Sequence, residues 1–179
     1  MIQDLVRKAI EAELTHTPLP SLVELGATGL PEVDTKSLAY VTLYADGVVI
    51  ASTGRIHNTS RTTLEECFVN ARAALLDPRA VGKITADTLP NMKVRVDIIG
   101  NDDKRVVQNI SEINPREEGI IFISQNLVAA SVLLPRMCEV GSTAETLFDV
   151  VCKKAGVSPN IARSDYVLYA IRSTIYSDF

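Results

Sequence analysis

The chain has 179 residues, of which 46% are hydrophobic and 22% are charged, a balance typical of a globular domain with an apolar core. Its formal net charge is −4 and its pI is about 5.2, which disfavours nucleic-acid binding because such binding needs a basic surface. No apolar run approaches the ~18 residues of a membrane span, so we expect no membrane association.

The cysteines and the N-terminal run favour a cytoplasmic protein with free thiols. MIQDLVRKAIEAEL carries Asp4 and Glu11 within its apolar pattern and predicts an amphipathic helix, not a signal peptide. Cys67, Cys138 and Cys152 are scattered and odd in number, which is typical of reduced thiols. We expect Cys138 and Cys152 to be buried and reduced. No CxxC or Cys/His cluster predicts a metal site, and the sequence leaves the cofactor unknown.

The first third of the chain predicts a helix followed by a hairpin. Apolar residues at helical spacing predict a helix over residues 2–14. Residues 15–37 contain three prolines and two glycines, and are expected to form an ordered surface loop. Residues 39–44 and 48–52 are rich in β-formers. They predict the two strands of a hairpin, because Asp46-Gly47 between them is a tight-turn signal.

A second helix and a strand follow. Thr62 and Glu65 have the spacing of a capping box, which predicts a helix over about 63–76. Asp77-Pro78 is expected to stop it, since the residue before a proline disfavours the helical conformation. Residues 92–99 alternate apolar with charged side chains and predict a half-buried strand.

The last third predicts a hairpin, a helix and a final strand. Residues 119–124 form an apolar strand pattern, and residues 127–134 predict the returning strand. The pair Ser142 and Glu145 predicts a capped helix over 143–155, and 166–175 predicts a last strand. Helices and hairpins are segregated and do not alternate as βαβ units. The sequence therefore predicts an α+β fold with antiparallel sheets.

The order and spacing of these motifs resemble the AMMECR family over almost the whole chain. The segments that carry the resemblance are VRKAIEAEL (6–14), AYVTLYADG (39–47), NARAALLDPR (70–79), ITADTLPNMKVRVDII (84–99), EEGIIFISQNLVAASVLLPRM (117–137) and LFDVVCKKAGV (147–157). No one of these segments is specific alone, but their order together is.

The resemblance implies a single AMMECR-type domain over residues 1–179, built as two lobes. Both chain ends would form the larger lobe around an antiparallel sheet, and the smaller lobe would lie within roughly 85–140. The expected site is a cleft between the lobes. The family often occurs beside Memo-type and radical-SAM proteins, which are therefore candidate partners, but its activity is unsettled.

The family's most characteristic run, Leu-Arg-Gly-Cys-Ile-Gly, matches Val-Ile-Ala-Ser-Thr-Gly at residues 49–54. Ile50 stands at the arginine position and Ser52 at the cysteine position, and Gly54 alone is retained. A role that rests on a guanidinium or a thiolate there does not carry over to this chain.

The candidate ligand-binding residues lie at this run, in the polar loop 55–61 and on the helix that follows. They are Ser52, Thr53, Gly54, Arg55, His57, Asn58, Arg61 and Asn70. The loop precedes a helix N-terminus, whose free N–H groups suit an anion, although a solvated loop is the simpler interpretation. Asn70 is expected to be a buried structural hydrogen-bonder.

Ser52 is expected to be a polar residue at a strand end. As a nucleophile it would need a base and an oxyanion hole; His57 is the nearest base, and no GxSxG motif is present. We therefore assign no catalytic residue and no metal ligand.

Two functional hypotheses follow. The first is a non-enzymatic binding or accessory protein that holds a small anionic metabolite, or a protein partner, in the interlobe cleft. The alternative is an enzyme that acts on a small molecule or a modified nucleotide through Ser52, His57 or a bound cofactor. RNA binding is disfavoured by the pI and by an aromatic content of 5%.

Overall fold

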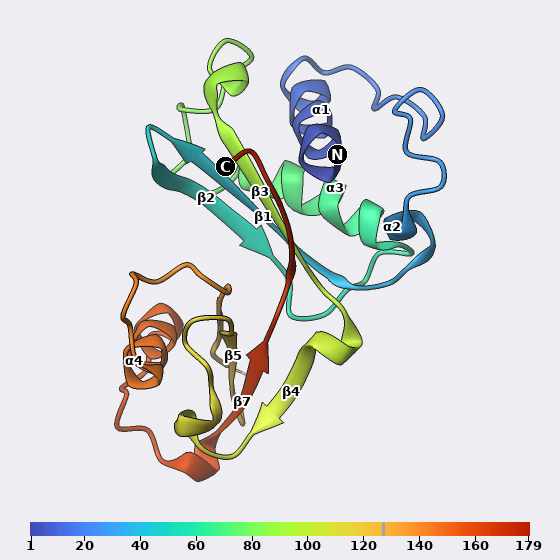
Figure 1. Cartoon of the computed structure of the whole chain (residues 1–179). Coiled ribbons are helices and arrows are strands. Elements are labelled where there is room, and N and C mark those ends of the chain that lie inside the picture. Colours follow the sequence, from blue (N-terminus) through green and yellow to red (C-terminus); the bar gives the residue numbers. More distant parts are fainter. Residues whose placement is uncertain (127) are drawn as a thin grey trace. The chain divides into compact units, whose positions relative to one another are not determined.

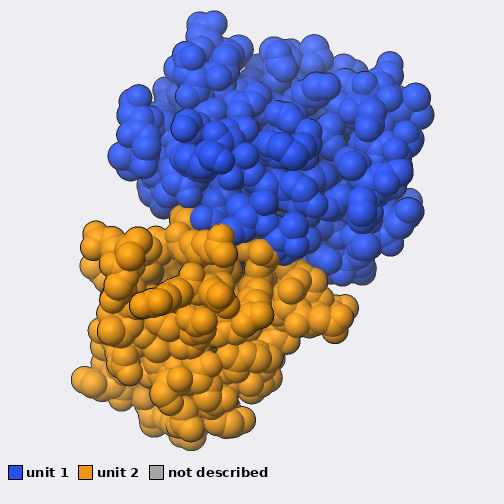
Figure 2. Space-filling view, viewed as in Figure 1, with its two compact units in different colours: residues 1–98, 174–179 blue, residues 99–173 orange. Residues whose placement is uncertain are grey.

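The computed structural model describes residues 1–126 and 128–179, which form two compact units (Figure 2). Unit 1 consists of residues 1–98 and 174–179, and unit 2 of residues 99–173. Unit 2 begins and ends later in the chain than the range of 85–140 expected for the smaller lobe. The stretch before Ile99 belongs to unit 1 because Val94 and Val96 are buried in the core of that unit.

Unit 1 packs helices against a four-stranded sheet whose strand order is β2–β1–β3–β8 (Figure 1). Its elements are α1 (Ile2–Leu14), α2 (Pro31–Asp34), β1 (Leu38–Ala45), β2 (Val48–Gly54), α3 (Thr63–Ala74), η1 (Leu89–Asn91), β3 (Lys93–Ile99) and β8 (Thr174–Ser177). The β1–β2 and β3–β8 pairs are antiparallel. Figure 1 shows α1 and α3 on the same side of the sheet. The apolar stripes of both helices are buried there with β1, in one core.

Unit 2 has a second four-stranded sheet, in the order β4–β7–β5–β6, covered by α4. Its elements are η2 (Asn101–Asp103), β4 (Lys104–Val107), η3 (Ile110–Glu112), β5 (Gly119–Ser124), β6 (Ala130–Leu133), α4 (Ala144–Ala155), η4 (Arg163–Asp165) and β7 (Tyr166–Ile171). Its described strand pairs are antiparallel. The Phe122, Phe148 and Tyr166 rings meet in its core, where the Tyr166 centroid lies 5.3 Å from each of the other two. The predicted α+β fold with antiparallel sheets is confirmed.

The prediction of one last strand over 166–175 is wrong. β7 ends at Ile171 and β8 begins at Thr174, so two strands are separated by Arg172 and Ser173. β7 pairs with β4 and β5, whereas β8 pairs with β3. The sequence pattern that favours a strand continues across residues 172–173. The strand is interrupted there because its hydrogen-bonding partners change from one sheet to the other, which is a tertiary effect.

Smaller differences also have local causes. Thr143, not Ser142, is the N-cap of α4, because its side chain accepts the hydrogen bond from the Thr146 N–H at 3.2 Å. The predicted returning strand 127–134 is observed as the shorter β6, and Leu127 lies outside the described residues. β4 was not predicted, since its residues do not alternate between apolar and polar. Within residues 1–126 and 128–179, no helix has the length and apolar character needed to cross a bilayer.

All three cysteines are free, but they differ in burial. Cys67 and Cys152 are buried, and burial raises the pKa of the Cys67 thiol to about 12. Cys138 is half-buried, so the prediction that it is buried is wrong. The reason is its place in the loop between β6 and α4, outside any regular element.

We predict that thiol alkylation of the native protein separates these cysteines. Iodoacetamide should modify Cys138 first, because Cys67 and Cys152 react only after local or global opening. Peptide mass spectrometry over a time course measures the three rates, and all three should converge in denaturing urea. Native modification of Cys152 as fast as that of Cys138 would contradict this description of the core.

Candidate functional site

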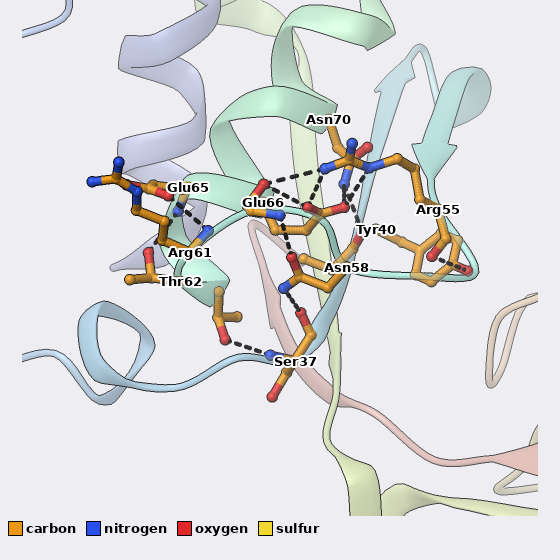
Figure 3. Close-up of polar contacts among 12 residues, drawn as sticks. Ser37, Tyr40, Arg55, Asn58, Arg61, Thr62, Glu65, Glu66 and Asn70 are labelled. Carbon is orange, nitrogen blue, oxygen red and sulfur yellow. Dashed lines mark hydrogen bonds and ion pairs between the residues drawn. The ribbon is translucent and has the colours of Figure 1, made fainter.

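The predicted site residues lie in unit 1, at the end of β2, in the loop 55–61 and on α3. The structure gathers three of them, Arg55, Asn58 and Asn70, in one polar cluster (Figure 3). The centre of this cluster is Glu66, which was not predicted. It lies in the first turn of α3.

Glu66 is a fully buried carboxylate that accepts four hydrogen bonds. Its side chain is 0% exposed. The Arg55 guanidinium binds both of its oxygens, with Nε donating to Oε1 at 2.8 Å and Nη2 donating to Oε2. The Ser60 hydroxyl donates to Oε2 at 2.7 Å, and the Asn70 amide donates to Oε1 at 3.2 Å. A bidentate arginine and two neutral donors therefore satisfy a charge that would otherwise be costly to bury.

The protonation states follow from this geometry. Burial alone would raise the pKa of Glu66, but the hydrogen bonds from Arg55, Ser60 and Asn70 outweigh it and hold that pKa below its ordinary value. The hydrogen bond to Glu66 raises the pKa of Arg55 in turn. The pair is therefore ionised at neutral pH.

Asn70 links this cluster to the sheet. Its side-chain amide donates to the Ala39 carbonyl of β1 at 2.9 Å as well as to Glu66, and the residue is 2% exposed. Its own carbonyl accepts from the Thr53 hydroxyl of β2 at 2.7 Å. Asn70 thus ties α3 to both strands of the hairpin, in keeping with the structural role expected of it.

Gly54 is required by the ring of Tyr40. The two residues face each other in the β1–β2 register. A Cβ built on Gly54 would lie 1.9 Å from the Tyr40 Cδ1 atom, inside the ring's van der Waals surface. The Tyr40 hydroxyl donates to the Arg55 carbonyl at 3.0 Å. The retained glycine of the run 49–54 therefore lets an aromatic ring lie flat over the strand and hold the start of the loop.

Ser52 is an interior residue of β2 and not its end, since the strand continues to Gly54. Its hydroxyl lies 3.1 Å from that of Thr42, its cross-strand neighbour, and its N–H donates to an Asp77 oxygen at 3.2 Å. The Arg79 guanidinium, which donates to Asp77, lowers the pKa of that carboxyl to about 2. The side chain at the family's cysteine position thus takes part in a polar contact between strands.

Hydrogen bonds of Asn58 and Ser60 hold the loop 55–61 against the rest of unit 1, and from residue 57 onward every second side chain is exposed. Asn58 donates to the Ser37 carbonyl at 2.5 Å and accepts from the Ser60 N–H at 2.7 Å. The residues that alternate with Asn58 and Ser60, which are His57, Thr59 and Arg61, are exposed. Figure 3 shows the Arg61 guanidinium on the side away from Glu66. We call His57, Thr59 and Arg61 the exposed row.

The N–H groups at the start of α3 are largely occupied by the protein itself. The Thr63 N–H donates to the Thr35 carbonyl at 2.8 Å, and the Glu65 N–H donates to the Thr62 hydroxyl at 3.2 Å. Glu65 and Glu66 also place negative charge in the first turn, where it complements the helix dipole. A ligand of this loop would therefore be recognised by side chains more than by the helix end.

The only signal that the sequence carried for Glu66 is its spacing from Asn70. Glu66 lies four residues before Asn70, so the two share one face of α3, but that face lies outside the apolar stripe of the predicted helix. An acid and an amide on a face outside the apolar stripe are typical of a solvated surface, so the pattern did not indicate their burial. Arg55, the ion-pair partner of Glu66, precedes the helix in the chain, so helical spacing carries no information about this pair.

We predict that Arg55→Ala destabilises the fold more than Glu66→Gln. Removing the arginine leaves a buried carboxylate without a counter-charge, which should cost about 3 kcal/mol; we take the lower end of the usual range because Arg55 is 37% exposed. Glutamine keeps an acceptor for Arg55, so its cost should be about 1–2 kcal/mol. Urea unfolding at pH 7 measures both, and the reverse order would contradict the assignment of Glu66 as the buried ion.

We also predict that Gly54→Ala and Tyr40→Ala are coupled. The added methyl group collides with the Tyr40 ring and should cost about 1–3 kcal/mol in the wild-type background. In the Tyr40→Ala background the ring is gone, and the same change should cost under about 0.5 kcal/mol. A double-mutant cycle by urea unfolding gives the coupling energy. Additive effects would show that another neighbour excludes a side chain at this position.

Comparison with known proteins agrees with this architecture. The uncharacterized protein PH0010 from Pyrococcus horikoshii, known from a crystal structure, matches with a TM-score of 0.82 over 98% of this chain and 89% of its own. At 20% sequence identity that likeness establishes a shared fold. A search of curated proteins finds no significant match. The model of the AMMECR1 family matches residues 3–176, and the chain therefore belongs to the AMMECR1 family.

Proposed function

We propose that this AMMECR1-family protein is a non-enzymatic binding or accessory protein that recognises an anionic group through the loop 55–61. The group would belong to a small metabolite or to a protein partner. The observation that carries the proposal is the Glu66 cluster, which holds Arg55 and Ser60 while the exposed row His57, Thr59 and Arg61 faces solvent.

A loop held in this way suits recognition. A surface loop that is already ordered loses less conformational entropy when it binds, which improves affinity without a new contact. The exposed row offers an imidazole, a hydroxyl and a guanidinium. Arginine binds carboxylates and phosphates with two parallel hydrogen bonds, so Arg61 is the expected anchor of the anion. Arg55 serves Glu66 instead.

The surroundings of Ser52 support binding more than nucleophilic catalysis. An active serine needs a base that accepts its proton. Here the side chain that contacts the Ser52 hydroxyl is Thr42, and a neutral hydroxyl is too weak a base for that role. Enzymatic action on a small molecule or modified nucleotide is the alternative. Memo-type or radical-SAM partners and a site between the lobes rest on family association alone and stay predictions.

The proposal is tested by titrating inorganic phosphate, at constant ionic strength, into the ¹⁵N-labelled full chain. Amide resonances of residues 57–61 should shift and saturate. Arg61→Ala should weaken this binding by about 1.5–3 kcal/mol, the value of a charge-assisted hydrogen bond. Arg72→Ala is the matched control, since Arg72 is an exposed arginine on α3 that pairs with Glu13. Its removal should leave the binding unchanged.

Two results would count against the proposal. One is the lack of saturable shifts at residues 57–61, and the other is an equal loss of binding in both arginine variants. A serine-directed phosphonate separates the enzymatic alternative, because we expect no adduct at Ser52. Stoichiometric labelling of Ser52 that His57→Ala blocks would make the hydrolase hypothesis primary.

A further inference from the structure

Unit 2 contains a pocket of about 630 Å³, and none of its lining residues belongs to the loop 55–61. One wall is Pro115 and Arg116, from the turn before β5, and the other is the loop that leads from β6 to α4, with Arg136, Cys138 and Ser142. The volume is within the range of small-molecule sites.

The pocket has an excess of positive charge. Arg116 and Arg136 contribute two cations, and Glu139 is the one carboxylate among its described lining residues. The local balance is therefore +1 (two minus one) in a chain whose net charge is −4. A concave surface with a net positive charge attracts anions.

Both guanidiniums are available to a ligand. Within residues 1–126 and 128–179, neither has an ion pair or a side-chain hydrogen bond. Other arginines of the same unit are engaged: Arg105 binds Glu118, and Arg163 binds three backbone carbonyls. Two free arginines facing one pocket thus contrast with the way this unit uses its other arginines.

The backbone at Arg136 adds a second, independent observation. Its φ is 59°, in the left-handed region that favours glycine. An arginine at this position is under strain, and such strain is often found at functional sites. Cys138 nearby brings no negative charge, because burial raises the pKa of its thiol.

We propose that this pocket binds a small molecule carrying a carboxylate or phosphate group, with Arg116 and Arg136 as the residues that bind the oxyanion. The Cys138 thiol lies in the wall and is covered when the pocket is filled. The site is separate from the loop 55–61, and each can fail without the other.

Cys138 serves as the reporter in the test. The native protein is treated with the neutral disulfide dithiodipyridine, at constant ionic strength, in increasing inorganic phosphate or increasing succinate. Modification of Cys138, followed by mass spectrometry, should slow saturably. The anion that protects at lower concentration distinguishes a phosphate ligand from a carboxylate ligand. Amide resonances of Gly141 and Ser142, followed in the same titrations, give a readout that does not depend on thiol reactivity.

The variants isolate the two arginines. Arg116→Ala and Arg136→Gly should each weaken protection by about tenfold or more, the effect of one lost charge-assisted hydrogen bond. Arg136→Gly suits the left-handed backbone, so it should keep or raise the unfolding midpoint. Lys153→Ala removes one exposed charge from α4, outside the pocket, and should leave protection unchanged. Absence of saturable protection and of resonance shifts, or equal losses in all three variants, would overturn the proposal.

Discussion

A single buried carboxylate organises the candidate region of this protein. Glu66 lies in the first turn of α3 with its side chain fully enclosed, and a charge in that position is tolerated only when donors surround it. Those donors come from three parts of the chain: Arg55 after β2, Ser60 in the loop, and Asn70 one turn along the helix. The need to satisfy one ion thus couples the helix, the hairpin and the loop.

The run 49–54 has mainly structural roles in this chain. Ile50, at the family's arginine position, is buried with the apolar core. Ser52 contacts Thr42 across the hairpin, Thr53 binds the Asn70 carbonyl, and Gly54 makes room for Tyr40. The polar chemistry of the region has its centre one element later, on α3. Because the residues of the run 49–54 are used in these structural contacts, we assign anion recognition to the loop 55–61 and not to β2.

The chain passes from unit 2 back into unit 1 near its C-terminus, and local sequence patterns do not reveal where. The sequence predicts one strand over residues 166–175, yet its first part pairs within unit 2 as β7 and its second part pairs within unit 1 as β8. Arg172 and Ser173 lie where the partners change, and the Arg172 N–H donates to the Asp103 carbonyl at 2.8 Å. A strand ladder depends on its neighbours, so its ends are decided by the sheet and not by propensity.

The sequence by itself determined the fold class, the family, and most of the helices and strands. α1 was predicted over its full range because its apolar stripe is regular, and the β1–β2 hairpin because Asp46-Gly47 marks its turn. Periodicity and turn chemistry are local, so a sequence reveals them directly. It also pointed to Arg55, Asn58 and Asn70 as polar residues of interest.

Only the tertiary structure decided what those residues do. The link between Arg55 and Glu66 spans a loop, and the fit of Tyr40 over Gly54 depends on strand register. The pairing of a buried charge is a matter of distance and enclosure in three dimensions, and both arise only when separate segments pack together. For the same reason, the half-buried Cys138 and the free arginines beside it could not be told from the sequence.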